Sequence, residues 1–162
     1  MLALPLRADA GDVVNAGVIV NAGVRVDNLT NQATGVVTNT ATGDWTGTLA
    51  GNAGDITNKG IWTGHASNSG TLANGGTWQG SLTNQATGVT VNTAAGTWTG
   101  GANNAGDLTN KGTWTGHTNN SGTLANGGTW QGSLTNQVTG VTVNTAAGTW
   151  TGGANNAGDL TN

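Results

Sequence analysis

The chain has 162 residues, of which 30 are Gly and 7 are Trp, with one Pro and no Cys, Phe or Tyr. The lack of Cys excludes disulfides and Cys-ligated metals, and four basic residues spread among seven acidic ones form no basic patch for nucleic acid or an anionic membrane. Leu, Ile and Val are scarce enough to be typical of a disordered chain, but a net charge of only −3 argues against disorder.

The first ten residues, MLALPLRADA, form the non-repetitive part of the chain. Their apolar run is too short for a transmembrane helix, which needs about 20 residues. Ala8, Asp9 and Ala10 have the A-x-A form of a signal-peptidase site, although Arg7 is unusual there. We interpret residues 1–10 as a leader remnant or an appended tail, and residues 11–162 as a single repeat domain.

The repeat begins before the first Trp. Asn15 to Arg25 (NAGVIVNAGVR) aligns without gaps on Asn104 to Trp114 (NAGDLTNKGTW), which places Arg25 in the Trp column. Leu29 and Asn31 then continue the pattern. About eight or nine repeat units are therefore present.

Trp residues mark the repeat at steps of 16, 17 or 20 residues. They are Trp45, Trp62, Trp78, Trp98, Trp114, Trp130 and Trp150. Three steps make a block of 52 residues, the separation of Trp98 and Trp150, and residues 81–110 and 133–162 differ only at Ala86 and Val138. The chain is interpreted as a fragment of a longer array that arose by duplication of such blocks.

Each unit alternates restricted and variable positions. When the residue before Trp is position one, position four is Gly, position six is Leu, Ala or Thr, and position eight is Asn. In the short units position twelve is Leu or Ile and position fourteen is Asn. The Asn residues at position eight are Asn68, Asn84, Asn104, Asn120, Asn136 and Asn156, with Asn52 in the same place after a one-residue insertion. Odd positions vary among polar residues, so the pattern has the period of two of a β-strand with one crowded face.

Each unit is too short and too rich in Gly to bury a core by itself. Stacking the units in parallel at about 4.8 Å would place Trp on Trp, Leu on Leu and Asn on Asn. We therefore predict an all-β, parallel β-solenoid (β-helix) with coils of 16–20 residues, interior Trp and Leu stacks, and Asn ladders at the turns. Asn74 and Asn126, each followed by Gly, indicate the rival arrangement of antiparallel hairpins.

Every third coil carries four extra residues. They accompany the VTVNT segments that begin at Val89 and Val141. The neighbouring units are four residues shorter. The prediction is a bulge or a longer turn at one edge of the stack, repeated in every third coil.

Ionisable residues are sparse and regularly separated. Asp55, Asp107 and Asp159 stand 52 residues apart, as do His65 and His117. Three coils correspond to about 14 Å, too far for paired-carboxylate hydrolysis, which needs about 5–9.5 Å, or for a shared metal. The sequence therefore predicts no enzyme, no cofactor and no metal site.

The segments NAGVIVNAG, GTWTG, NNAGDLTNKGTWTG and NSGTLANGGTWQG resemble the repeats of secreted β-solenoid proteins of Gram-negative bacteria. These are the autotransporter passengers and filamentous-haemagglutinin-like adhesins, and the resemblance covers residues 11–162. It implies a non-enzymatic structural or adhesive module at the bacterial surface or outside the cell. The expected partners are a host or neighbouring-cell surface or further copies of the repeat, with no nucleic acid and no membrane insertion by this segment.

Two other functions follow from other features. Thr pairs flank several Trp residues and form a candidate ice-binding face: Thr97, Thr99, Thr113, Thr115, Thr149 and Thr151. Gln79 and Gln131 interrupt that pattern and argue against ice binding. Outward-facing Trp rings would instead form a stacking platform for carbohydrate, an alternative supported by Arg25 in the Trp column.

Overall fold

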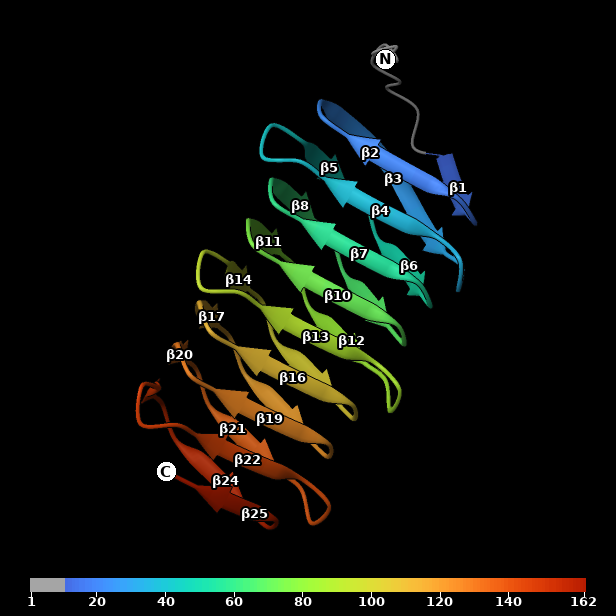
Figure 1. Cartoon of the computed structure of the whole chain (residues 1–162). Coiled ribbons are helices and arrows are strands. Elements are labelled where there is room, and N and C mark those ends of the chain that lie inside the picture. The colour runs from blue at the N-terminus through green and yellow to red at the C-terminus, as the bar shows by residue number, and fades with distance from the viewer. Residues whose placement is uncertain (1–10) are drawn as a thin grey trace.

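The computed structural model describes residues 11–162 as one stack of parallel β-coils (Figure 1). Residues 1–10, interpreted above as a leader remnant or tail, lie outside the described residues. Each complete coil supplies one strand to each of three faces, and every strand pair in the described chain is parallel. The predicted parallel β-solenoid is confirmed, and the antiparallel hairpin alternative is wrong.

The first two faces belong to one 16-stranded sheet, because strand β3 runs around a corner and contributes to both. The first face consists of the start of β3 (Val24–Asn31), β5 (Asp44–Thr46), β8 (Ile61–Thr63), β11 (Thr77–Gln79), β14 (Thr97–Thr99), β17 (Thr113–Thr115), β20 (Thr129–Gln131) and β23 (Thr149–Thr151). The second face consists of β1 (Gly11–Asn15), the end of β3, β6 (Leu49–Asn52), β9 (Ala66–Asn68), β12 (Leu82–Asn84), β15 (Ala102–Asn104), β18 (Thr118–Asn120), β21 (Leu134–Asn136) and β24 (Ala154–Asn156).

The third face is a separate nine-stranded sheet. It consists of β2 (Val18–Asn21), β4 (Val36–Asn39), β7 (Asp55–Asn58), β10 (Thr71–Asn74), β13 (Val89–Asn92), β16 (Asp107–Asn110), β19 (Thr123–Asn126), β22 (Val141–Asn144) and β25 (Asp159–Thr161). In the described chain, no helix is long and apolar enough to cross a membrane.

The Trp residues form one continuous stack inside the solenoid. The six from Trp45 to Trp130 are fully buried, and Trp150 in the last coil is half-buried. Successive ring centroids lie 4.6 to 5.0 Å apart, with interplanar angles of 4° to 8°. Burying an indole removes about 150–250 Å² from water, which is worth about 4–6 kcal/mol before the entropy cost. The prediction of interior Trp is confirmed.

Arg25 occupies the Trp column, as the alignment predicted, and pairs with Trp45. Its contacts do not support the hypothesis that the Trp rings face outward and bind carbohydrate. Its guanidinium carbon lies 4.7 Å from the Trp45 ring centroid, and its Nε donates to Asp27 at 2.6 Å. Arg25 therefore covers one end of the buried indole stack with a cation–π contact. Outward-facing Trp, the basis of the carbohydrate platform, is wrong.

Gly at position four makes the corner between the first and second faces. At Gly100 the backbone has φ +148°, which side-chain-bearing residues rarely adopt, and an added Cβ would lie 2.2 Å from the carbonyl oxygen of Gly80. That same Gly80 carbonyl accepts a 2.9 Å hydrogen bond from the Trp98 indole. The Gly column thus turns the chain, and its carbonyl groups accept from five of the indoles, those of Trp62, Trp78, Trp98, Trp114 and Trp150. The Trp45 indole donates to the Asp27 carbonyl instead, and Trp130 Nε1 has no partner.

The four extra residues of the long coils are divided between two corners. After Asn84 the chain takes four residues to reach β13, where the short coil takes only two after Asn68, and the same difference follows Asn92 and Asn74. The longer loops project from opposite sides of the stack in Figure 1. Recurrence in every third coil is confirmed, but a single expanded edge is wrong.

The segment expected to hold the extra residues is itself a regular strand. Strand β13 pairs in register with β10 and β16, so that Thr90 lies between Leu72 and Leu108 in the interior. Thr90 is fully buried and its hydroxyl donates to Asn84 Oδ1 at 3.0 Å. The two turns lengthen while the strand keeps its place in the stack.

The first testable prediction concerns the indole stack. Trp98→Ala should lower the free energy of unfolding by about 3–5 kcal/mol, because it opens a cavity between two rings and removes their stacking partner. Thr99→Ala, on the exposed side of the same strand, should change it by less than about 0.5 kcal/mol. Urea denaturation followed by Trp fluorescence measures both, and equal effects would contradict an interior stack.

Candidate functional site

Two columns of buried Asn side chains run along the stack. One lies at the ends of the second-face strands, and the other lies at the ends of the third-face strands. Asn104 is typical: its Nδ2 donates to Asn120 Oδ1 at 2.8 Å, to the Gly106 carbonyl at 3.0 Å and to the Thr123 carbonyl at 2.8 Å. Its own Oδ1 accepts from Asn84 Nδ2 at 2.8 Å. Each amide therefore ties its own turn to the next coil.

The first column joins all seven Asn residues predicted to form a ladder, from Asn52 to Asn156. It also extends upstream to Asn15 and Asn31. A second column runs from Asn21 to Asn162 through the last Asn of each third-face strand and makes the same bonds on the other corner. These groups are structural, because their hydrogen-bonding capacity is directed along the stack rather than to solvent.

The Thr pairs lie on the outer side of the first face. The strands β14 and β17 align Thr97 with Thr113 and Thr99 with Thr115. Thr149 and Thr151 lie two coils further along, beyond the strand that carries Thr129 and Gln131. All of the predicted Thr residues are exposed except Thr113, which is half-buried. The structure thus aligns the Thr residues in two outward columns, one before and one after Trp. In the column after Trp, Gln131 takes the place of Thr.

The two His residues pair with hydroxyl groups on the neighbouring coils. His65 Nδ1 lies 2.7 Å from Ser81 Oγ, and His117 Nδ1 lies 2.7 Å from Ser133 Oγ. His117 Nε2 also lies 2.9 Å from Asn119 Oδ1. The spacing along the chain correctly predicted that the two His residues do not meet. It did not reveal their Ser partners, which a comparison of position five in adjacent coils could have found.

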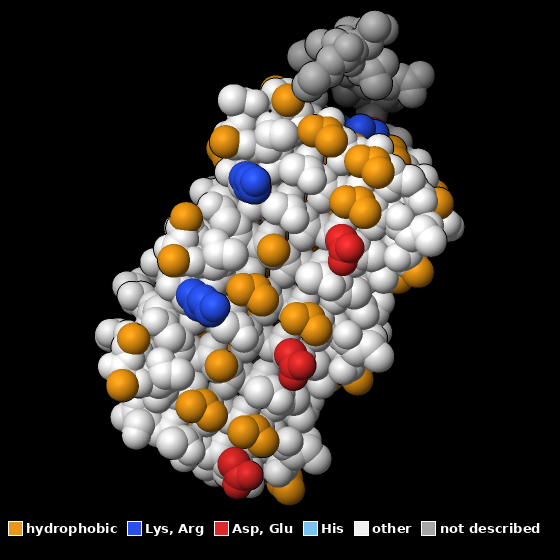
Figure 2. Space-filling view, in the orientation of Figure 1, with side chains coloured by type: hydrophobic (Ala, Val, Ile, Leu, Met, Phe, Trp, Pro, Cys, Tyr) orange, Lys and Arg blue, Asp and Glu red, His pale blue; other side chains and the backbone are white. Residues whose placement is uncertain are grey.

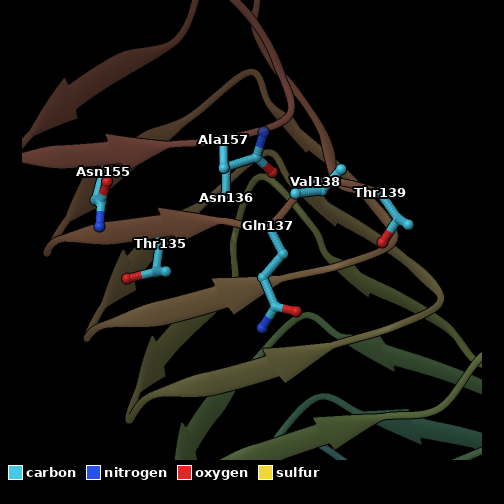
Figure 3. Close-up of a pocket in the computed structure, with 7 residues that line it drawn as sticks. All are labelled: Thr135, Asn136, Gln137, Val138, Thr139, Asn155 and Ala157. Atoms are coloured by element: carbon cyan, nitrogen blue, oxygen red, sulfur yellow. The ribbon is translucent and has the colours of Figure 1, made fainter.

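Shallow grooves lie on the second face beside the longer turns. In Figure 3, Thr135 and Asn155 lie on neighbouring strands, and Gln137 begins the turn that carries Val138 and Thr139. This groove has a volume of about 340 Å³. Its lining combines hydroxyl, amide and small apolar groups.

A second groove of about 420 Å³ lies one block earlier. It is lined by Thr83, Gln85, Ala86, Asn103 and Ala105, which occupy the positions of Thr135, Gln137, Val138, Asn155 and Ala157 in the 52-residue repeat. The two grooves therefore share a repeated set of lining residues. The second also extends to Asn119, Ser121 and Gln137, so that Gln137 lines both. Sequence reasoning missed them because it placed the extra residues in the wrong part of the coil.

Acidic residues do not meet one another in the regular array. Asp55, Asp107 and Asp159 are all exposed, each at the first position of a third-face strand. Among residues 11–162, no group of three or more His and Asp side chains gathers as metal ligands would. The one ion pair between described side chains is that of Arg25 and Asp27.

Comparison of the chain with protein-family models, with curated proteins and with solved structures found no match. The family resemblance therefore rests on the repeat segments, and the structure supports its coarser content, a β-solenoid with Asn ladders.

The second prediction tests the ladder. Asn104→Ala should lower the free energy of unfolding by about 3 kcal/mol, because it interrupts the ladder and leaves the buried Asn120 Oδ1 without a donor. It also removes one hydrogen bond each from Asn84 Nδ2 and from the carbonyl groups of Gly106 and Thr123. Asn103→Ala is the matched control, since the neighbouring Asn103 faces outward and should change stability by less than about 0.5 kcal/mol. Urea denaturation of both variants measures the difference. A similar cost for the two would contradict a structural ladder.

Proposed function

We propose that this chain is a non-enzymatic adhesive or structural module, carried on a bacterial surface or released outside the cell. Its partners are a host or neighbouring-cell surface, or further copies of the repeat. The single observation that carries the proposal is the repetition of the same outward groove at the 52-residue spacing along one stack. The resemblance of the repeat segments to secreted bacterial β-solenoids supports the bacterial surface as its place of action.

The physical basis is multivalent attachment. Each groove offers amide and hydroxyl groups that donate and accept hydrogen bonds, which suits a neutral polar surface. One shallow groove of this kind binds weakly, but related grooves held on one stack raise the effective concentration of each further contact. The inward residues meanwhile stabilise the stack, so that the outer groups can vary without loss of the fold.

The third prediction tests this function by removing one block. Deletion of residues 81–132 joins Gly80 to Ser133 and preserves the repeat, because residues 81–110 and 133–162 are nearly identical. Cells that display the shortened chain should attach less strongly but still attach. Cells that display the Gln85→Ala/Gln137→Ala variant should also attach less strongly, although their solenoid remains folded, because the variant removes groove side chains. Adhesion under flow measures both, with circular dichroism as the check on folding. Unchanged attachment in the deletion and the groove variant would contradict the proposal.

Ice binding remains the second candidate because the Thr rows are in register on an exposed sheet. Thr97 and Thr99 align with Thr113 and Thr115 at the spacing of adjacent strands. The replacement of Thr by Gln79 and Gln131 in every third coil breaks the second row and favours the adhesive function.

The fourth prediction separates these candidates. Purified protein should leave the recrystallisation of ice unchanged, and so should the Thr99→Tyr/Thr115→Tyr variant. Strong inhibition by the original chain that disappears in the Tyr variant would replace the adhesive proposal with ice binding.

A further inference from the structure

The outer side of the third face combines an apolar strip with a regular charge pattern. Its apolar members include Val18, with 75% of its surface exposed, and Val20, with 58%. Val89 and Val141 repeat the apolar character further along, at 40% and 39%. Asp and Thr side chains stand between these Val residues in the same column, and Val20 begins the middle column of the face. Exposed apolar groups repeated along one face are typical of a surface that contacts another protein.

Charged residues lie on the two borders of the third face, with the acidic ones in the same column as Val89 and Val141. Asp55 and Asp107 begin the strands β7 and β16, and Lys59 and Lys111 directly follow the ends of the same strands. The backbone N–H of Lys59 still bonds to the Asn39 carbonyl at 2.8 Å, so the strand alternation continues to Lys59 and directs it outward. Figure 2 shows acidic side chains along one border and basic ones along the other, at matching heights on the stack.

The spacing of these charges follows from strand geometry. Each Asp and the Lys of its own coil are four residues apart, or about 13 Å across the face. The next Asp–Lys set lies three coils away, at about 14 Å along the stack. One border column of the third face thus carries Asp in every third coil, and the other carries Lys in matching coils, with Thr, Ala and Val in the column between them.

This arrangement is complementary to itself under one rotation. A two-fold axis parallel to the stack, placed over the column of Thr57, Ala73 and Val91, exchanges the two borders of the face and keeps every height unchanged. Asp55 of one copy then lies opposite Lys59 of the other, and Asp107 lies opposite Lys111. A two-fold axis across the stack would instead bring Asp columns together.

The residues between the charges fit the same rotation. Val91 and Ala73 meet their own counterparts on the axis, and Thr71 lies opposite Gly75, which offers room for its side chain. Nine strands at about 4.8 Å and a width of about 15 Å give about 600 Å² for each copy and about 1,200 Å² in total. This total is at the lower limit of specific interfaces, so the association is reversible.

We propose that the third face docks a second copy of this chain, face to face and with the two stacks parallel. The proposal rests on the adhesive function above and names its partner as a second copy of this chain, bound at a face distinct from the grooves. Two chains displayed side by side on one surface, which point the same way, would be joined through matching 52-residue blocks. Each added block contributes further Asp–Lys contacts and apolar contacts.

The fifth prediction uses charge reversal in the full chain. The original protein should associate reversibly in sedimentation velocity, and more weakly as salt rises from low to high concentration. Lys59→Glu/Lys111→Glu should raise the dissociation constant about tenfold or more, because four exposed ion pairs become repulsive contacts. Asp55→Lys/Asp107→Lys should do the same.

Mixing these two variants in equal amounts should restore association as a heterodimer, since each then presents the charge that the other lacks. Thr46→Glu/Thr99→Glu/Thr151→Glu is the matched control, because it adds negative charge at a similar spacing on the first face and should leave association unchanged. Circular dichroism checks that each variant keeps the β-fold.

Three results would overturn the docking proposal: a monomeric original chain at millimolar concentration, equal loss in the first-face control, or no recovery on mixing. Adhesion of the same variants to a surface that carries no copies of this chain is measured separately. Intact adhesion with no self-association would reject this inference alone, whereas lost groove-dependent adhesion with intact self-association would reject the grooves alone.

Discussion

The spacing between parallel β-strands, about 4.8 Å, determines which side chains can fill this molecule. Each interior position meets its own counterpart in the next coil at that distance. A flat indole ring suits the distance well, and ring centroids from Trp45 to Trp150 follow it at 4.6 to 5.0 Å. In the Trp and Asn columns the neighbours of each side chain are copies of itself, whereas the Leu columns also accept Ala or Thr.

The corners meet the same constraint with polar groups. A turn leaves backbone carbonyl groups near the interior, where an unpaired polar group is costly. Asn104 satisfies the carbonyl groups of Gly106 and Thr123 and still bonds the next Asn. Asn has a side chain of the right length, with a donor and an acceptor that can both be used at one strand spacing. This explains why its column persists through long and short coils alike.

Sequence reasoning predicted the interior because burial restricts residue choice at regular positions. Trp98, Gly100 and Asn104 recur at fixed places, and even the substitution at Arg25 fell in the correct column. The turns were harder, because the four extra residues of the long coil are polar and small wherever they lie. Only the register of Thr90 with Leu72 and Leu108 assigns β13 to the regular stack. The grooves and the His–Ser pairs depend on contacts between coils, which residue spacing in one coil does not contain.

The Asn ladders also have a direction. Every Nδ2 donates to the Oδ1 of the following coil, so all the side-chain amides are aligned, and neighbouring amides polarise one another. At the first coil the acceptor ends are occupied by the backbone N–H groups of Gly17 and Gly23, which bond Asn15 and Asn21. The solenoid is therefore a polar filament with two chemically different ends. Further coils can continue its ladders only head to tail, because reversing one segment would bring donor against donor at the junction.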